Sequence, residues 1–469
     1  MINRRCEMQK VKRKIITDFT EGSVPKQLIK FSIPFMLSNA LQILYSLVDM
    51  LVVGRILKGP GLSAVSTASQ VFTFMTMLSM GFSTGGQVRI AQLIGANRRR
   101  DVGKVIGTLF TIVTVMGIAM TVIGISIMHP VLKLLNTPEA AYQYAVDYTL
   151  VCSCGIIFTY GYNMVSAVMR GMGDSKHPLV FIAIASVINL ILDIVFVAFW
   201  NMGTFGAALA TIIGQAFSFI YAVYFLYRHR DEFDFDFKPK SFIPEKETLR
   251  ELTRLGVPFA LQSCAINISM MFVSSLINDV SVEASSVFGV GVKVDDIVNK
   301  ITQAFSFAVS AMVGQNIAAG KESRIRSVFF LAMLYSAVLY AAFTVVYIMF
   351  PEKLFSLFTD DAGVIELAPV FVKAIVWGFP GMIIMRSTNG FIQGIGNAKL
   401  SLIFALIDGF VMRITLSYVI GVTMGYGLFG YILGYGLAPF GTAVPGLIYF
   451  LSGTWKKRMP SMKTQNIVG

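Results

Sequence analysis

The stretch that decides the fold occurs twice, first as Leu28-Ile-Lys-Phe-Ser-Ile-Pro34-Phe-Met-Leu37 and again as Leu252-Thr-Arg-Leu-Gly-Val-Pro258-Phe-Ala-Leu261. The two prolines are separated by 258 − 34 = 224 residues. Further landmarks recur in the same order at an offset of 223 or 224: Ala91-Gln92 as Gly314-Gln315, Arg170–Lys176 as Gln393–Lys399, and Gly203–Gly206 as Gly427–Gly430. This constant offset predicts two homologous halves, which would enclose a cavity where they face each other.

The composition predicts a membrane-embedded protein. Of 469 residues, 55% are hydrophobic and 14% are charged, and the mean hydropathy is +0.69. A helix needs roughly 20 apolar residues to cross a bilayer. Twelve such stretches are expected, near 28–57, 61–95, 101–128, 138–169, 177–200, 203–228, 250–278, 284–319, 322–350, 363–393, 399–423 and 426–455. We therefore predict an all-α polytopic membrane protein with twelve transmembrane helices in two six-helix lobes.

The halves divide the chain into an N-terminal lobe (1–228), a cytoplasmic linker (229–249) and a C-terminal lobe (250–469). The linker segment Asp231-Glu-Phe-Asp-Phe-Asp-Phe237 alternates like a strand, but we interpret it as a surface linker. An even number of spans in each half keeps both halves in the same orientation, so the repeat is parallel and its axis lies along the membrane normal.

The net charge of +13 raises nucleic acid as a partner, but the distribution of the charge argues against it. One set of loops holds the basic clusters: Arg4 to Lys30, Arg98 to Lys104, Arg170 and Lys176, Arg228 to Arg254, Lys321 to Arg326, Lys399, and Lys456 to Lys463. The opposite loops show only Arg55, Lys58, Lys133 and Lys353. By the positive-inside rule both termini are cytoplasmic. We expect a monomer in the plasma membrane, with membrane lipids and no nucleic acid as partners.

The sequence lacks the signatures of several enzyme classes. Neither Arg170–Lys176 nor its repeat matches the phosphate-binding loop G-x-x-x-x-G-K-[ST], so ATP use is unsupported. No pattern of catalytic serine or of a metal hydrolase appears, and Cys152-x-Cys154 has no histidine partner that would suggest a metal site. We therefore expect no enzyme activity, no metal and no cofactor. An ion gradient, of Na⁺ or H⁺, remains as the energy source.

The most informative polar residues lie inside the N-terminal half. Asp49 and Asp193 lie in predicted spans, where a charged residue costs about 2.5–3.5 kcal/mol at mid-bilayer. Thr211 is predicted at the same depth, and Tyr45 and Asn189 each stand four residues before an acid, on the same helix face. Such a set of oxygen ligands suits a hard cation or a proton. The alternative is a buried structural polar network.

The repeat provides an internal control for this cluster. The positions equivalent to Asp49, Asp193 and Asn189 are 49 + 224, 193 + 223 and 189 + 223, and they hold Val273, Leu416 and Met412. A purely structural role would more naturally appear in both halves, so the control favours ion binding.

The C-terminal half has charges of its own. Lys293, Asp296 and Lys300 form i,i+3 and i,i+4 pairs, so local neutralisation explains much of the cluster around Asp295 and Asp296. Asp408 and Arg413 are five residues apart, do not face each other on an α-helix, and are expected to find partners elsewhere. These residues are possible functional charges; Arg386 is a further intramembrane charge.

Three prolines, Pro34, Pro258 and Pro380, lie inside apolar spans and should kink their helices. Such a kink serves either curvature for packing or a bend that moves, and Pro34 is the candidate hinge.

Taken together, these residues resemble the multidrug and toxic compound extrusion (MATE) family over all twelve spans. The resemblance rests on Pro34 followed by Asp49, Asn189-x3-Asp193 followed by Thr211, the span ends at Gln92 and Gln315, and the paired turns Gly171-x-Gly173 and Gly394-x-Gly396. It implies a two-lobed antiporter that exports amphipathic organic cations in exchange for sodium ions or protons. It places Asp49, Asn189, Asp193 and Thr211 at the family's N-lobe cation site, with Tyr45 beside them.

The chain departs from some family members, which carry essential acids in spans 7 and 10. Here span 7 has no acid between Glu251 at its start and Asp279, and span 10 has only Glu366 near its start, so coupling is expected in the N-lobe. One alternative is a related flippase of lipid-linked saccharides, which would be favoured if Lys293, Lys300, Arg386 and Arg413 all converged on the cavity. Another is a membrane-embedded enzyme or receptor, which the missing catalytic pattern and soluble domain oppose.

Overall fold

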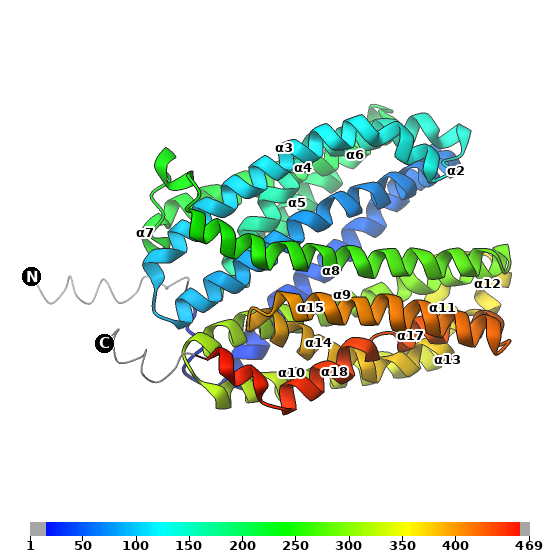
Figure 1. Cartoon of the computed structure of the whole chain (residues 1–469). Coiled ribbons are helices and arrows are strands. Elements are labelled where there is room, and N and C mark those ends of the chain that lie inside the picture. Colours follow the sequence, from blue (N-terminus) through cyan, green and yellow to red (C-terminus); the bar gives the residue numbers. More distant parts are fainter. Residues whose placement is uncertain (1–15, 460–469) are drawn as a thin grey trace, which may run out of the picture.

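The computed structural model describes residues 16–459, which form helices and no strands (Figure 1). Arg4 and Lys463 of the terminal basic clusters lie outside this range. Ten helices in the described range are long and apolar enough to cross a membrane. The expected spans 61–95 and 284–319 are not among these ten, although both are helical. The second of them carries four charged residues near its middle, which lowers its hydropathy. The all-α class is confirmed.

The N-lobe is built from five helical segments that match the expected spans closely. They are α2 (Val24–Gly95), α3 (Val102–Leu134), α4 (Glu139–Gly171), α5 (Lys176–Asp193) with its extension η2 (Ile194–Phe199), and α6 (Gly203–Arg228). α2 contains the first two expected spans. The chain reverses direction between them. Phe35 and Ser38 line the same small pocket as Met80 and Ser83, whereas a straight helix would hold these two pairs more than about 60 Å apart.

The C-lobe repeats this plan with more interruptions. Its helices are α8 (Lys246–Asn278), α9 (Val282–Ala318), α10 (Glu322–Met349), α11 (Pro351–Phe355), α12 (Ala362–Glu366), α13 (Ala368–Ile375), α14 (Phe379–Gly394), α15 (Ala398–Leu406), α16 (Thr415–Tyr418), α17 (Gly427–Leu437) and α18 (Phe440–Leu451). A 3₁₀ turn, η4 (Val376–Gly378), separates α13 from α14, so Pro380 lies in the first turn of α14 rather than inside a continuous helix. The repeated turns after α4 and α14 both contain a glycine with positive φ, Gly173 and Gly396.

Three segments are π-helical, with hydrogen bonds between residues five apart. Two of them, η2 and η6 (Val419–Thr423), end equivalent spans of the two halves. The third, η5 (Ile407–Ile414), has no counterpart among the π-helical segments of the N-lobe and contains Asp408 and Arg413.

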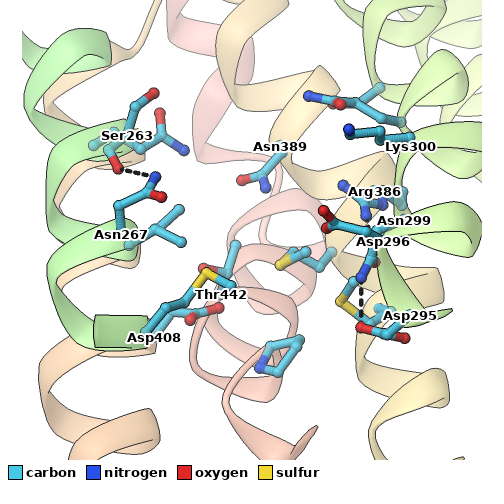
Figure 2. A pocket seen from close by; sticks show the side chains of 18 of the residues that line it. Ser263, Asn267, Asp295, Asp296, Asn299, Lys300, Arg386, Asn389, Asp408 and Thr442 are labelled. Carbon is cyan, nitrogen blue, oxygen red and sulfur yellow. Dashed lines mark hydrogen bonds between the residues drawn. The ribbon is translucent and has the colours of Figure 1, made fainter. Parts of the chain in front are cut away.

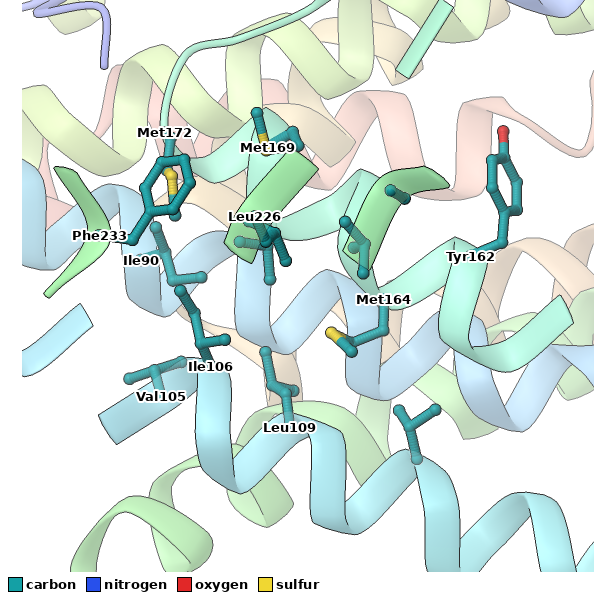
Figure 3. Packing of buried hydrophobic residues seen from close by; sticks show 14 of the residues in the cluster. Ile90, Val105, Ile106, Leu109, Tyr162, Met164, Met169, Met172, Leu226 and Phe233 are labelled. Atoms are coloured by element: carbon teal, nitrogen blue, oxygen red, sulfur yellow. The ribbon is translucent and has the colours of Figure 1, made fainter. Parts of the chain in front are cut away.

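The largest buried cluster fills the N-lobe where α2, α3, α4 and α6 meet (Figure 3). Ile106 and Leu109 of α3 pack there with Met164 of α4 and Leu226 of α6. This cluster consists of aliphatic and aromatic side chains, so it supplies packing and no chemistry of its own. Function must come from the few buried polar residues.

The linker is packed against the N-lobe rather than lying loosely on the surface. It forms α7 (Arg230–Phe233) and η3 (Pro239–Phe242), and its alternating phenylalanines turn inward: Phe233 and Phe235 are buried. Phe235 stacks on Phe110 of α3. The Ser241 hydroxyl and the Lys238 backbone N–H donate to Asp236, which lowers the pKa of that carboxyl to about 2. The strand-like alternation therefore places aromatic side chains against the N-lobe, and no strand forms within the described chain.

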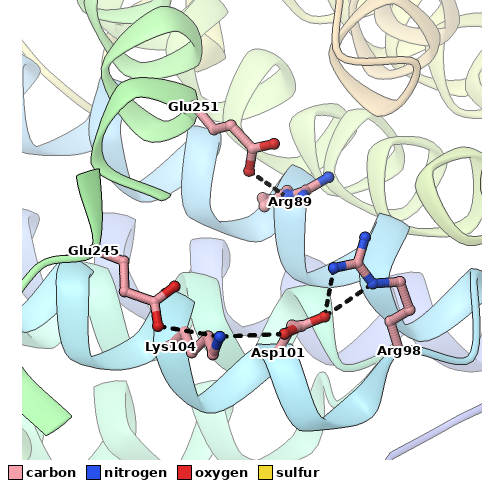
Figure 4. Close-up of polar contacts among 6 residues, drawn as sticks. All are labelled: Arg89, Arg98, Asp101, Lys104, Glu245 and Glu251. Atoms are coloured by element: carbon pink, nitrogen blue, oxygen red, sulfur yellow. Dashed lines mark hydrogen bonds and ion pairs between the residues drawn. The ribbon is translucent and has the colours of Figure 1, made fainter. Parts of the chain in front are cut away.

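Ion pairs tie this region to its surroundings (Figure 4). Lys104 of α3 contacts Glu245 at 3.0 Å, and Arg89 of α2 contacts Glu251 of α8 at 2.8 Å. We call this part of the molecule the linker end, since it holds the linker and the turns that follow α2, α4, α9 and α14.

The first helix of each lobe begins on the other lobe. Leu28 of α2 is fully buried in a C-lobe cluster with Val328 and Phe329 of α10, whereas Leu252 of α8 is fully buried in the N-lobe cluster. Leu28 and Leu252 are repeat-equivalent, 224 residues apart. The duplicated stretch thus produces two reciprocal crossings between the lobes. Figure 1 shows the N-lobe helices diverging from the C-lobe toward the end labelled α2 and α12.

The lobes meet at the linker end through residues with little or no side chain. A Cβ added to Gly81 would lie 2.4 Å from the backbone N of Ala260, and one added to Gly95 would lie 2.0 Å from the carbonyl O of Gln315. Gln92 donates through Nε2 to the carbonyl of Gly394 at 3.1 Å. The backbone of α2 therefore approaches those of α8 and α9 too closely for a side chain at either glycine.

Gln315, the repeat-equivalent of Gln92, contacts the other lobe indirectly. A segment of residues 16–22, which we call the strap, lies between them. Gln315 donates to the carbonyl of Thr17 at 3.1 Å, and the N–H of Thr17 donates to the carbonyl of Met172 at 3.0 Å. Arg324 of α10 donates to the carbonyls of Phe19 and Gly22. The strap therefore connects the end of α4 in one lobe to α9 and α10 in the other.

Replacing Gly95 by alanine is expected to separate the lobes at the linker end, because the added methyl would collide with a backbone oxygen that cannot rotate away. Spin labels can be attached through Arg100→Cys and Ser323→Cys, exposed positions on opposite lobes, in a variant without native cysteines. Double electron–electron resonance should then show a longer distance between the two labels in Gly95→Ala. Gly289→Ala is the control, since an added Cβ there meets nothing within 4 Å. An unchanged distance distribution for Gly95→Ala would contradict this packing argument.

Candidate functional site

Five polar residues singled out in the sequence meet inside the N-lobe. Thr211 of α6 lies at the centre: its Oγ1 is 3.3 Å from the Tyr45 hydroxyl, and it accepts from Asn189 Nδ2 at 3.3 Å. The Thr211 hydroxyl itself donates to the carbonyl of Ala207 at 3.0 Å. Because α2, α5 and α6 each contribute a residue, the cluster depends on the packing of three helices.

The two acids of this cluster face each other. Asp49 and Asp193 lie close enough for their carboxyl groups to interact, and Asn189 lies beside Asp193. Asp49 is 8% exposed and Asp193 is 1% exposed. Oδ1 of Asp49, both carboxylate oxygens of Asp193 and Oδ1 of Asn189 have no hydrogen-bond donor. The geometry thus presents four buried acceptor oxygens that need a proton or a cation.

A neighbouring pair extends the cluster beyond what the sequence predicted. Tyr148 and Cys152 of α4 lie beside Asp49 and next to each other. Cys152 is buried, whereas Cys154, two residues later, is exposed. Its position four residues after Tyr148 was the available signal, but nothing in the sequence placed α4 next to the acids.

A second polar region is a cavity of about 460 Å³ in the C-lobe, a volume typical of small-molecule sites (Figure 2). It contains all four of the possible functional charges of this half: Asp295, Asp296, Asp408 and Arg413. Helices α8, α9 and α14 line it, together with η5 and α17. Met80 and Thr84 of α2 reach it from the other lobe, so the cavity extends to the interface between the lobes.

The expectation that Asp408 and Arg413 do not face each other is wrong. Arg413 Nη2 lies 2.8 Å from Asp408 Oδ1, and both side chains are at least nine-tenths buried. The reason is η5: a π-helix brings residues five apart onto one face, where an α-helix would separate them. The Arg413 guanidinium also covers the ring of Tyr435, 4.7 Å from its centre.

The charges of α9 do not form the direct ion pairs that their spacing allows, although Lys300 still attracts the Asp296 carboxylate. Among the ion pairs of the described residues, none joins Lys293 to Asp296 or Asp296 to Lys300. Lys293 is exposed and does not line the cavity, whereas Asp296 and Lys300 do. The i,i+3 and i,i+4 spacings allowed pairing, but these side chains turn toward the cavity or away from it instead.

Asn299 organises the acids and bases of α9 and α14, a role that the sequence did not indicate. Its Oδ1 accepts from Arg386 Nη2 at 2.7 Å, and its Nδ2 donates to Asp295 Oδ2 at 2.6 Å. The amide therefore stands between a guanidinium and a carboxylate that would otherwise pair directly. Its place four residues after Asp295 puts the two side chains on one face of α9, but this spacing alone does not predict the bond to Arg386.

A small pocket of about 130 Å³ lies between the lobes and shares four lining residues with the C-lobe cavity: Met80, Thr84, Gln303 and Phe307. Arg170 lines it and places its guanidinium over the Phe307 ring, 4.8 Å from the centre. The pocket has a mixed lining, in which amides and hydroxyls such as Asn39 and Gln42 lie beside the aromatic rings of Phe35 and Phe307.

Comparisons with known proteins agree on one family. The MatE family model matches residues 34–195 and 258–419, two segments that begin at the repeated prolines. The chain is 29% identical over 441 residues to the probable multidrug resistance protein YpnP of Bacillus subtilis (strain 168), covering 94% of this chain and 97% of that protein. It is 25% identical over 442 residues to the probable multidrug resistance protein NorM of Thermotoga maritima, covering 93% and 94%.

Solved structures show the same fold. A multidrug resistance MATE family transporter of the MOP superfamily, solved in an outward-facing conformation, superposes with a TM-score of 0.89 at 20% identity. The superposition covers 96% of this chain and 99% of that one. The two-lobed architecture is therefore shared over essentially the whole chain.

The Asp408–Arg413 pair should be strongly coupled in stability. Asp408→Asn should cost about 3–5 kcal/mol, because it leaves a buried guanidinium unpaired. Asp408→Asn combined with Arg413→Met should cost less than the sum of the single changes, which a thermal-unfolding cycle of the purified protein would measure. Arg326→Gln, which removes the half-exposed Glu322–Arg326 pair, is the control and should change the stability little. Strict additivity would show that the buried pair carries no coupling.

Proposed function

Because this chain belongs to the MatE family, we propose that it is a secondary active antiporter that exports organic cations in exchange for sodium ions or protons. Its relatives are named as multidrug resistance proteins, and its ten apolar helices make it a multi-pass membrane protein. We place it in the plasma membrane with both termini and the linker in the cytoplasm, as the basic clusters indicate. The linker end, where the lobes touch, is then the cytoplasmic end.

The observation that carries this proposal is the pair Asp49 and Asp193 with its unsatisfied oxygens. Two carboxylates in contact inside an apolar lobe repel each other when both are ionised. A proton or a sodium ion relieves that repulsion, and the acceptor oxygens of Asp49, Asn189 and Asp193 match the oxygen ligands that hard cations take. Carboxylates more than about 10 Å apart could not share one ion in this way.

The coupling follows from the position of the pair. Asp49 lies on α2, the helix whose start is buried in the C-lobe and whose Pro34 lacks the N–H that would complete the helical ladder. An ion bound between Asp49 and Asp193 draws α2 toward α5. A change in the tilt of α2 then alters its contacts with the C-lobe, so ion occupancy favours one arrangement of the lobes over the other.

The exported cation would occupy the cavity between the lobes. Met80, Met382 and Met385 line it with Phe307 and Phe379, and flexible thioethers and aromatic faces accommodate cations of varied shape. The flippase alternative is less well supported. Three of the four relevant bases, Lys300, Arg386 and Arg413, line the cavity and Lys293 does not, while three acids balance them.

Asp49→Asn and Asp193→Asn should each abolish gradient-driven efflux while leaving the protein folded, because the amide is nearly isosteric but cannot exchange a proton or balance a cation. Efflux of a fluorescent organic cation from proteoliposomes is the measurement, with gel filtration as the test of folding. Val273→Thr, at the repeat-equivalent of Asp49, is the control and should be nearly silent. Normal pumping by both Asn variants would rule out the N-lobe site.

The coupling ion can be identified with inside-out vesicles that carry no gradient, a sodium gradient or a proton gradient. We expect uptake of an ethidium-like dye to require one of the two gradients and to be independent of ATP, since the sequence has no phosphate-binding loop. Uptake that required ATP, or that ignored both gradients, would exclude antiport.

A further inference from the structure

The strap contacts both lobes within four residues. Ile16 is buried in the N-lobe cluster, whereas Phe19 is buried in the C-lobe cluster that also holds Leu28. The two side chains are three residues apart, and three residues of extended chain span at most about 11 Å. A wide separation of the lobes at the linker end must therefore pull the strap away from one of them.

The C-lobe holds the strap by its backbone. Lys321 at the start of α10 and Arg324 within it donate to four consecutive carbonyls of the strap, those of Phe19, Thr20, Glu21 and Gly22. The distances lie between 2.7 and 3.1 Å. In addition, Gln315 of α9 accepts from the N–H of Phe19 at 2.8 Å. Hydrogen bonds from a charged donor are about twice as strong as neutral ones, so the strap is firmly fixed to α9 and α10.

The N-lobe holds the strap by fewer and weaker contacts. In the described chain, one hydrogen bond joins the strap to the turn after α4, from the N–H of Thr17 to the carbonyl of Met172 at 3.0 Å. The strap also lies directly on Gly173, where an added Cβ would be 2.8 Å from the carbonyl oxygen of Thr17. These contacts, like the burial of Ile16, involve no charged group.

The equivalent segment of the other half does not make the bond that crosses between the lobes. Adding 224 to 16 and 22 gives residues 240–246, which precede α8 as the strap precedes α2. This segment lies on α3 of the N-lobe, where a Cβ added to Gly107 would be 1.9 Å from the carbonyl oxygen of Ser241. The N–H of Ser241, equivalent to that of Thr17, donates to Lys238 within the linker at 2.8 Å. The crossing bond of the strap is therefore an addition to the duplicated frame.

We propose that the strap is a latch that keeps the linker end closed, and that it leaves the N-lobe but stays on the C-lobe when the lobes separate there. This inference rests on the proposed transport function, since an exporter must open at its cytoplasmic end to load its substrate. The unequal contacts decide the direction, because separation breaks the neutral contacts with Met172 and Gly173 before the charged ones with Arg324. Because these neutral contacts are lost on opening, the strap favours the arrangement that is closed at this end.

Spin labels report which lobe the strap follows. Labels on Glu21→Cys of the strap, Arg100→Cys of the N-lobe and Lys399→Cys of the C-lobe, all exposed positions, are introduced in pairs into the full-length protein without native cysteines. Gly173→Ala weakens the latch, because the added methyl displaces Thr17 from the turn after α4. Double electron–electron resonance should then show at least about fivefold more of a long 21–100 distance, as expected for the loss of one hydrogen bond. The 21–399 distance should stay unchanged.

Gly425→Ala is the matched control. Gly425 has a φ of +74°, close to the +81° of Gly173, and a Cβ added there meets nothing within 4 Å. The substitution therefore imposes similar backbone strain without displacing the strap, and both distances should stay unchanged. The proposal would be overturned by a longer 21–399 distance with a constant 21–100 distance in Gly173→Ala, by no change in either distance, or by equal changes in Gly425→Ala.

Arg324→Gln tests the C-lobe side of the latch. It removes the charged donor, so the 21–399 distance should lengthen and the 100–399 distance, which joins the two lobes, should gain a longer population. Arg326→Gln lies on the same helix but removes a bond to Glu322 instead, and it should change neither distance. If Arg324→Gln only lowered the unfolding temperature and left the 100–399 distance unchanged, the strap would be a structural element and no latch.

A disulfide relates the latch to transport. A Cβ at position 173 would lie 2.9 Å from the Cβ of Thr17, and a small shift gives the about 3.5–4.5 Å of a disulfide. Thr17→Cys combined with Gly173→Cys should lose efflux from proteoliposomes when oxidised and regain it on reduction. Full efflux by the fully cross-linked protein would overturn the proposal. The spin-label distances need neither a gradient nor an organic cation, so they test the latch even if Asp49→Asn pumps normally and the proposed coupling fails.

Discussion

The burial of Leu28 in the C-lobe and of Leu252 in the N-lobe is the constraint on which the rest of the structure depends. Each lobe must lend the start of its first helix to the other, so neither lobe can complete its core alone. The crossings force α2, α8 and α9 together at the linker end, where Gly81 and Gly95 permit backbone contact. In this arrangement that contact keeps the lobes close together at the linker end and leaves room for the cavity farther along their length.

Duplication produced a symmetric frame, and the polar residues broke the symmetry in two different ways. The N-lobe placed Asp49 and Asp193 in contact at a site where the other half has Val273 and Leu416. The C-lobe instead acquired a mixed set of acids and bases around a cavity. Because the frame supplies equivalent packing on both sides, the differences concern chemistry rather than architecture. The contacts between the lobes at the linker end differ as well: Gln92 bonds directly to Gly394, whereas Gln315 bonds to Thr17 of the strap.

Most of the fold could be predicted because apolar length and a constant repeat offset are properties of the sequence itself; the expected span 203–228 coincides with α6. The meeting of Tyr45, Asn189 and Thr211 was also accessible, since helix depth and helix face follow from spacing. The pairing of Asp408 with Arg413 could not be predicted, because the sequence was interpreted with the α-helical period of 3.6 residues and the π-helix η5 was not expected. The bridging role of Asn299 and the inward turn of the linker phenylalanines depend on tertiary neighbours that no local pattern specifies.

The crossing of α8 from one lobe to the other has a mechanical consequence. Leu252 is embedded in the N-lobe, while Gln262, ten residues later, already bonds to Ser401 of the C-lobe. Pro258 lies within this short bridge. The remaining 16 residues to Asn278 extend about 24 Å beyond it, so the helix is a lever with one very short arm. A turn of about 10° at the bridge would carry the far end of the helix, where Val273 and Ile277 are buried in a C-lobe cluster, through about 4 Å. A small change in packing at the bridge between Leu252 and Gln262 therefore becomes a larger displacement near Asn278.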